Sequence, residues 1–222
     1  MRRILRENGL SIVLALLFVV FWVGQSVSGY RQYNNEQREH GESAIGFGEY
    51  LRTPHFWEAT TENWESEFFQ MFGYVILTAV LYQKGSSESK KLDEPEPVDS
   101  KPRASRRKRN LPWPVRRGGW ILKLYEQSLS LAFLLLFLFS ISLHAVSGAA
   151  EYNEEQAAHG EPSKLSAFQY AGTSRFWFES FQNWQSEFLA IASMVVLSIF
   201  LRQRGSPESK PVDSPHSETG SE

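Results

Sequence analysis

The chain has no cysteine among its 222 residues, which excludes a disulfide, a cysteine metal ligand and a cysteine nucleophile. It also lacks a Gly-rich phosphate loop, a His-Glu-x-x-His motif and a Gly-x-Ser-x-Gly motif. The centres of its apolar segments contain no Asp, Glu, Lys or Arg, which a proton pump normally needs inside the membrane. These absences predict a protein that is not an enzyme and has no cofactor or metal; an integral membrane metal-dependent enzyme is the alternative.

Charge and hydrophobicity occupy different parts of this chain. Four apolar segments predict membrane spans at about 8–27, 64–83, 127–146 and 184–203. The apolar core of the last segment is short, but its flanking turns extend it to about 21 residues, enough to cross ~30 Å of hydrocarbon. The predicted fold is an all-α membrane protein with four transmembrane helices and structured extracytoplasmic loops.

The two halves of the chain repeat one another at an offset of 119 residues, which becomes 120 after one inserted residue. The apolar start of the chain could be a cleaved secretory signal, but its internal copy favours a span. The pattern predicts two helical hairpins as parallel repeats, related by a two-fold axis along the membrane normal. The repeat is supported by identical polar residues at matching positions, among them Tyr33 with Tyr152, Asn34 with Asn153, Gln37 with Gln156, His40 with His159, Asn63 with Asn183, and Glu67 with Glu187.

The predicted organisation has four parts: hairpin repeat 1 in 1–85, a linker in 86–119, hairpin repeat 2 in 120–205 and a tail in 206–222. The linker and the tail are rich in Pro, Ser, Glu and Lys, a composition that predicts disorder. Lys and Arg gather in the linker and at the N-terminus, whereas the loops inside the hairpins are acidic. This asymmetry predicts cytoplasmic termini and extracytoplasmic loops.

The linker contains the basic run Arg106, Arg107, Lys108 and Arg109. Such a run is found in nucleic-acid patches and nuclear-localisation signals. Because these charges flank a predicted span, we favour contact with anionic lipid of the bilayer and expect no nucleic acid.

A first motif, Tyr-Asn-x-Glu-Gln-x-x-His-Gly-Glu, occupies 33–42 and 152–161. Glu and His lie four residues apart in both copies, so each pair shares one face of a helix. Such a pair can bind a metal or transfer protons. The favoured interpretation is a helix C-terminus, where His interacts with the helix dipole and Gly forms a left-handed cap. The candidate residues are Asn34, Glu36, Gln37, His40, Glu42, Asn153, Glu155, Gln156, His159 and Glu161.

A second motif, Asn-Trp-x-Ser-Glu-Phe, occupies 63–68 and 183–188 at the predicted outer mouth of the second span of each hairpin. A carboxylate at the edge of hydrocarbon needs a partner or water, so Glu67 and Glu187 are expected to face inward. They form either an ion site or a buried polar network with Asn63 and Asn183, and we favour the network. Trp64 and Trp184 are predicted interface anchors.

These motifs, with Glu-x-x-Leu-Ser before the first span and Gln-x-Gly-Ser-x-Glu-Ser-Lys after the second, resemble a bacterial family of small membrane proteins known only as a domain of unknown function. The resemblance implies helical hairpins in the bacterial inner membrane and brings no activity, substrate or catalytic residue. Arg175 replaces His55 and Ser174 replaces Pro54 between the copies, so these positions vary.

The expected function is a structural or partner-binding role through the acidic extracytoplasmic loops. The partner would be an envelope protein or a second copy of this chain. The alternative is a small channel or transporter that uses Glu67 and Glu187 in an outer vestibule.

Overall fold

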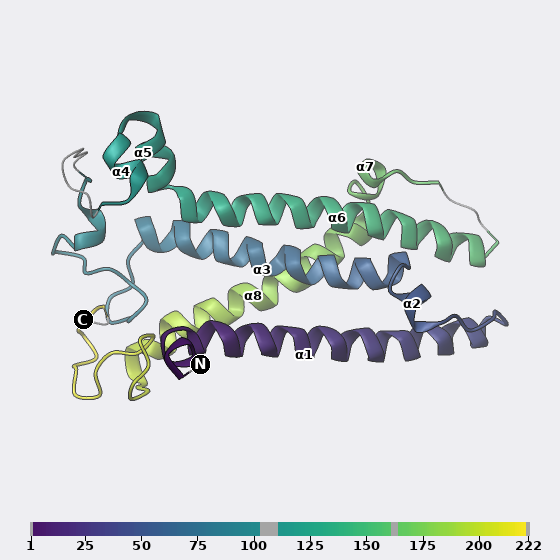
Figure 1. The fold of residues 1–222 in the computed structure, drawn as a ribbon, viewed down its shortest axis with the longest axis horizontal. Coiled ribbons are helices and arrows are strands. Elements are labelled where there is room, and N and C mark those ends of the chain that lie inside the picture. Colours follow the sequence, from purple (N-terminus) through teal and green to yellow (C-terminus); the bar gives the residue numbers. More distant parts are fainter. Residues whose placement is uncertain (1, 103–110, 161–163, 221–222) are drawn as a thin grey trace. The chain divides into compact units, whose positions relative to one another are not determined.

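The structure is a computed structural model that describes residues 2–102, 111–160 and 164–220. All regular elements in these residues are helical, and no strand occurs among them (Figure 1). The elements are α1 (Arg2–Glu39), α2 (Phe47–Tyr50), α3 (Pro54–Val80), the 3₁₀ helix η1 (Pro97–Asp99), α4 (Trp113–Arg117), α5 (Gly119–Glu126), α6 (Ser128–Ala158), α7 (Ala167–Tyr170) and α8 (Ser174–Phe200).

Three helices, α1, α6 and α8, are long and apolar enough to cross a membrane. Their large apolar side chains are widely exposed; Leu10 of α1 is 76% exposed and Phe21 is 68% exposed. A helix satisfies its backbone hydrogen bonds internally, so a helix with an apolar exterior is the form that hydrocarbon accepts. The all-helical prediction is therefore confirmed for the described residues, with three helices suited to a membrane.

The remaining long helix, α3, is as long as α8, at 27 residues, but it is not among the helices apolar enough to cross a membrane. Its continuous apolar part starts only near Phe68 and the helix ends at Val80, three residues before the predicted end of the span. The polar turns before Phe68 contain Glu62, Glu65 and Glu67. The second of the four predicted spans therefore stays a prediction.

The chain forms two compact units. Unit 1 comprises residues 1–60 and 143–170, and unit 2 comprises residues 61–142 and 171–222. Each unit combines segments from both predicted repeats. The candidate motif around the two His-Gly pairs lies wholly in unit 1, and the Asn-Trp-x-Ser-Glu-Phe motif lies wholly in unit 2.

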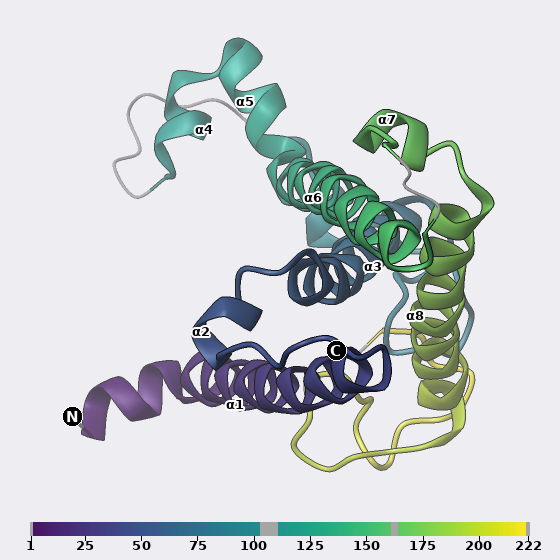
Figure 2. The same cartoon turned by 90° about the vertical axis from the view of Figure 1, so that its right-hand side faces the viewer.

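Unit 1 is held by a close approach of tyrosine to glycine that occurs twice. The short helix α2 lies beside α1, and α7 lies beside the C-terminal part of α6 (Figures 1 and 2). Tyr50 at the end of α2 packs on Gly29 of α1, and Tyr170 at the end of α7 packs on Gly148 of α6. Both tyrosines are buried, and a side chain at either glycine would overlap them.

Unit 2 contains the described linker and tail residues, which form turns with little helix. Gly85 and Gly205 have positive φ. The backbone amides of Gln83 and Gln203 donate to the hydroxyls of Ser89 and Ser209, at 2.8 and 2.9 Å. The buried Lys210 ammonium donates to the carbonyl of Gly85 at 2.5 Å. The predicted disorder of these segments stays a prediction, and the basic run 106–109 lies outside the described residues.

Candidate functional site: a histidine and glutamate pocket in unit 1

The end of α1 has the capping geometry that its sequence predicts. The amide of Glu42 donates to the carbonyl of Gln37 at 2.8 Å, and Gly41, at φ 78°, donates to Arg38 at 3.1 Å. This pair of bonds is the Schellman motif, which satisfies carbonyls left over at a helix end. Gly160 after α6 has the same φ of 78°. The predicted glycine cap is confirmed at the end of α1, and at the end of α6 the described part of the cap, with Gly160 donating to Ala157 at 3.0 Å, agrees with it.

Each capping histidine also has a defined ring orientation. The Nδ1 atoms of His40 and His159 lie 2.8 Å from the carbonyl oxygens of Glu36 and Glu155, respectively. Because a carbonyl oxygen only accepts, Nδ1 carries the proton, and Nε2 of the neutral ring keeps its lone pair. Among the described residues, neither Nε2 atom has a hydrogen-bond partner.

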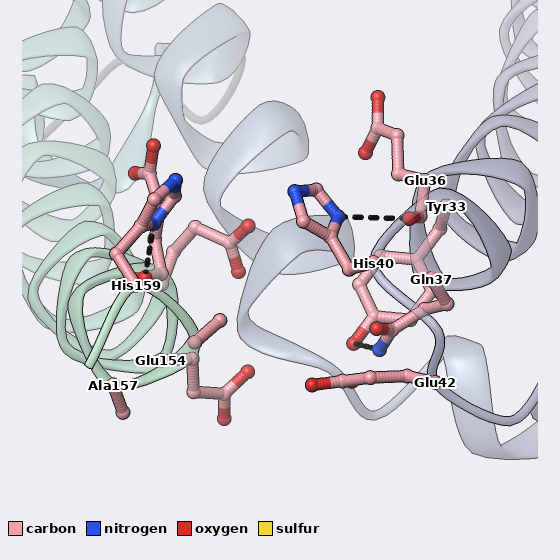
Figure 3. A pocket seen from close by; sticks show the side chains of 11 residues that line it. Tyr33, Glu36, Gln37, His40, Glu42, Glu154, Ala157 and His159 are labelled. Atoms are coloured by element: carbon pink, nitrogen blue, oxygen red, sulfur yellow. Dashed lines mark hydrogen bonds between the residues drawn. The ribbon is translucent and has the colours of Figure 1, made fainter.

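The two histidines lie close to one another, although 119 residues separate them (Figure 3). Their ring centroids are 6.1 Å apart and the ring planes meet at 70°. Figure 3 shows that the nitrogen without a hydrogen bond lies, in each ring, on the side that faces the other ring. The structure therefore brings together the two copies of the first motif.

The space between them is an acidic pocket of about 500 Å³. None of the described residues that line it is a lysine or an arginine. The lining consists of Tyr33, Glu36, Gln37, His40 and Glu42 from α1 and its cap, and Glu151, Glu154, Glu155, Ala157, Ala158 and His159 from α6 and its cap. We call this set of residues the His–Glu pocket.

The electrostatics of the His–Glu pocket favour a cation. Burial raises the pKa of the Glu154 carboxyl. Burial also raises the pKa of Tyr33, with smaller contributions from Glu154, Glu151 and Glu42, while a hydrogen bond from Gln37 at 2.9 Å opposes this rise. The burial contribution opposes a charge of either sign, and the carboxylate contributions to the Tyr33 shift show the negative field that favours a cation.

Tyr50 and His55, which also belong to unit 1, are influenced by carboxylates that line the pocket. Burial, together with Glu151 and Glu36, raises the pKa of Tyr50 to about 12. Burial lowers the pKa of His55 below its ordinary value, with Glu36 opposing the shift. The His55 ring lies 3.4 Å from the Tyr50 hydroxyl. Because its pKa is lowered by burial, the neutral form of the ring is favoured near pH 7.

We expect unit 1 to lose stability as the pH falls through the ordinary pKa of histidine. The folded pKa of His55 is lowered, so the unfolded chain binds the extra proton first, and stability falls with pH. Thermal unfolding of the protein in detergent at about pH 7.5 and about pH 5 measures the effect. His55→Gln should reduce the pH dependence, whereas His216→Gln should leave it unchanged; equal pH dependence in all three would contradict the assignment.

The asparagines of the first motif hold the loops that follow the helices. The Asn34 side chain accepts a hydrogen bond from the Ile45 amide at 2.7 Å and donates to the Ile45 carbonyl at 3.2 Å. Asn153 makes the same two bonds with Leu165, at 2.9 Å each. Asn34 is buried, so its role is structural. Gln156 is half-buried beside the pocket lining, and Glu161 lies outside the described residues.

In the second motif the structure buries a carboxylate that the sequence did not single out. Glu67 is exposed, and the buried carboxylate is Glu65, which accepts a hydrogen bond from the Trp184 indole at 3.0 Å. The α3 face that packs in unit 2 carries Glu65 and Gln70, and the predicted inward orientation of Glu67 stays a prediction. Glu187 is half-buried, and its backbone carbonyl accepts a bond from Gln70 at 2.7 Å.

The other members of the second motif serve helix packing in unit 2. Asn183 donates to the Glu62 carboxylate, whereas Asn63 is exposed. The Trp184 ring lies 4.4 Å from that of Phe69 and 6.3 Å from that of Phe137. Trp184 is thus engaged within unit 2, while Trp64 is half-buried and its predicted role as an interface anchor stays a prediction.

Sequence reasoning missed Glu151, Glu154 and Glu65. Glu151 and Glu154 align with Gln32 and Asn35 at the repeat offset, so a search for identities between the copies passes over them. The helical spacing of Glu151, Glu155 and His159, four residues each, is the signal that places them on one face.

The described residues thus form an all-helical fold, in which three helices are suited to a membrane. The chain matches the family described as a domain of unknown function, DUF6766, over residues 1–221, and it belongs to that family. No curated protein and no solved structure matches the chain.

Proposed function

We propose that this protein is a four-span protein of the bacterial inner membrane that binds a cationic partner in the His–Glu pocket on its outer face, without catalysing a reaction. The observation that carries the proposal is the convergence of two acidic helix ends, each with the same His-Gly cap, on a pocket lined by five glutamates. An envelope protein with an exposed Lys or Arg, or a second copy of this chain, has the required chemistry.

Duplication of one hairpin accounts for the matched geometry in the two halves. The Tyr–Gly contact, the asparagine clamp on the loop, the His-Gly cap and the threonine that accepts the Phe56 or Phe176 amide at 3.3 Å all occur twice. These pairs follow the sequence offsets of 119 and 120. They support parallel repeats, in which both pocket-forming helix ends reach the same side of the membrane.

The orientation rests on charge. The acidic pocket lies in the predicted outer loops, and the basic linker lies on the other side, where anionic lipid would hold Arg106 to Arg109. Both termini are then cytoplasmic. α3 serves as the second span in this arrangement, with Glu62, Glu65 and Glu67 at the outer mouth.

Thiol labelling tests both the charge preference and the side of the pocket, because the natural chain has no cysteine. We expect a cationic trimethylammonium thiosulfonate to react with Ala157→Cys faster than an anionic sulfonate thiosulfonate does. Normalised to the rate ratio at the exposed Phe168→Cys on α7, the preference should be about tenfold, the scale on which a charged cleft concentrates a counter-ion. Both reagents are membrane-impermeant and are applied to spheroplasts.

The matched variants decide the outcome. Glu154→Gln combined with Glu155→Gln should reduce the normalised ratio at Ala157→Cys, and Val98→Cys in the linker should react only after the membrane is permeabilised. A normalised ratio near one at Ala157→Cys would contradict cation binding. Rapid labelling of Val98→Cys in intact spheroplasts would contradict the orientation.

The channel or transporter alternative has less support. It requires Glu67 and Glu187 to line an outer vestibule, and no pocket found among the described residues contains either of them. Loss of ion flux in Glu67→Gln combined with Glu187→Gln, at unchanged expression, would favour this alternative over the binding role.

A further inference from the structure

We infer that the His–Glu pocket accepts, besides the Lys or Arg of a protein partner, a divalent transition-metal ion bound by Nε2 of His40, Nε2 of His159 and carboxylates of the pocket. This inference rests on the proposed function, because it assigns a ligand class to the same pocket. It goes further in giving the two histidines a role that helix capping does not require. A cap uses one ring nitrogen at most, and the other faces the pocket.

The hydrogen bond of each ring prepares its other nitrogen for metal binding. A ligating histidine typically donates its non-ligating N–H to a carbonyl or carboxylate, which fixes the tautomer and the ring orientation. His40 and His159 have this arrangement already, with Nδ1 held 2.8 Å from a backbone carbonyl in both cases. The acceptor belongs to the helix itself, so the orientation does not depend on a mobile side chain.

The distance between the rings fits one shared ion after a small adjustment. Two imidazoles on a single tetrahedral Zn²⁺ have ring centroids about 5 Å apart, given Zn–N bonds of about 2.0–2.1 Å. The observed separation is 6.1 Å, so the rings must approach by about 1 Å. Both histidines are exposed at helix ends, where side-chain rotation provides this movement without disturbing a core.

The remaining ligands are carboxylates, and their number selects the class of ion. Glu36 and Glu155 lie one helical turn before the two histidines, and Glu42, Glu151 and Glu154 complete the lining. Imidazole with carboxylate suits Zn²⁺, Co²⁺, Ni²⁺ and Cu²⁺, whereas Mg²⁺ and Ca²⁺ prefer sites of oxygen alone. A divalent ion would also offset the clustered negative charge of the pocket.

Zinc titration of the purified full-length protein in detergent tests the inference. We expect one Zn²⁺ per chain by calorimetry and no binding of Mg²⁺ at the same concentration. His40→Asn and His159→Asn should each weaken zinc binding by at least about tenfold, the scale of a disturbed metal site. His55→Asn and His216→Asn are matched controls outside the pocket lining and should bind zinc as the natural protein does.

A second measurement avoids any effect of substitution on folding. X-ray absorption of the zinc complex of the unaltered protein should show two imidazole ligands with oxygen in the remaining positions. A spectrum without imidazole, an absence of zinc binding, or equal losses in the pocket and control variants would overturn the metal assignment. If the charge preference at Ala157→Cys persists while zinc fails to bind, only the metal assignment falls; if that preference is absent, the proposed function falls.

Discussion

Gly148→Ala is expected to destabilise the protein by about 1–3 kcal/mol, because the added methyl group overlaps a buried tyrosine ring. A Cβ at this position would lie 2.9 Å from Cζ and 3.0 Å from the hydroxyl oxygen of Tyr170, and closer still to Cε1. Tyr170 is fully buried, so its ring has little room to withdraw. Thermal unfolding in detergent should show a midpoint lower by about 2–10 °C.

Two further glycines in unit 1 serve as matched tests. Gly24→Ala has nothing within 4 Å of the new Cβ, so it should gain about 0.5–1 kcal/mol from helix propensity. Gly29→Ala meets the hydroxyl of Tyr50, whereas the nearest ring carbon is 3.2 Å away. Adding Tyr50→Phe should therefore rescue Gly29→Ala, while Tyr170→Phe should rescue Gly148→Ala poorly. Equal midpoints for Gly24→Ala and Gly148→Ala would contradict this packing.

The sequence predicts the parts of this molecule that depend on local chemistry. The long apolar segments of the sequence predict α1 and α6, because a segment of that length and hydropathy is typical of a membrane-spanning helix. The His-Gly dipeptides predict where α1 and α6 end, since glycine adopts a positive φ without strain. The tyrosine, asparagine and histidine contacts of unit 1 occur at positions that the repeat already pairs.

What the sequence does not predict is which residues from distant segments meet. The four-residue spacing of Glu36 and His40 is compatible with capping and with metal binding, and the nearness of His159 appears only in three dimensions. The inward face of α3 is likewise set by packing in unit 2. Glu65 and Glu67 are two residues apart, and periodicity alone does not say which of them meets Trp184.

Glu65→Ala is expected to destabilise the protein by about 1–3 kcal/mol, because it leaves the half-buried Trp184 indole N–H without its acceptor. The Glu65 side chain is fully buried and accepts the Trp184 bond at 3.0 Å. Glu67→Ala, two residues along the same helix, removes an exposed carboxylate and should change stability by less than about 0.5 kcal/mol. Thermal unfolding of the two variants side by side gives the comparison.

Two more variants separate the hydrogen bond from the loss of packing. Glu65→Gln keeps an amide oxygen as an acceptor, so it should retain most of the stability that Glu65→Ala loses. Trp184→Phe removes the donor and keeps an aromatic ring beside Phe69. In a double-mutant cycle the Glu65 and Trp184 substitutions should therefore be non-additive by at least about 0.5 kcal/mol. Strict additivity, or equal losses in Glu65→Ala and Glu67→Ala, would show that α3 presents a different face to α8.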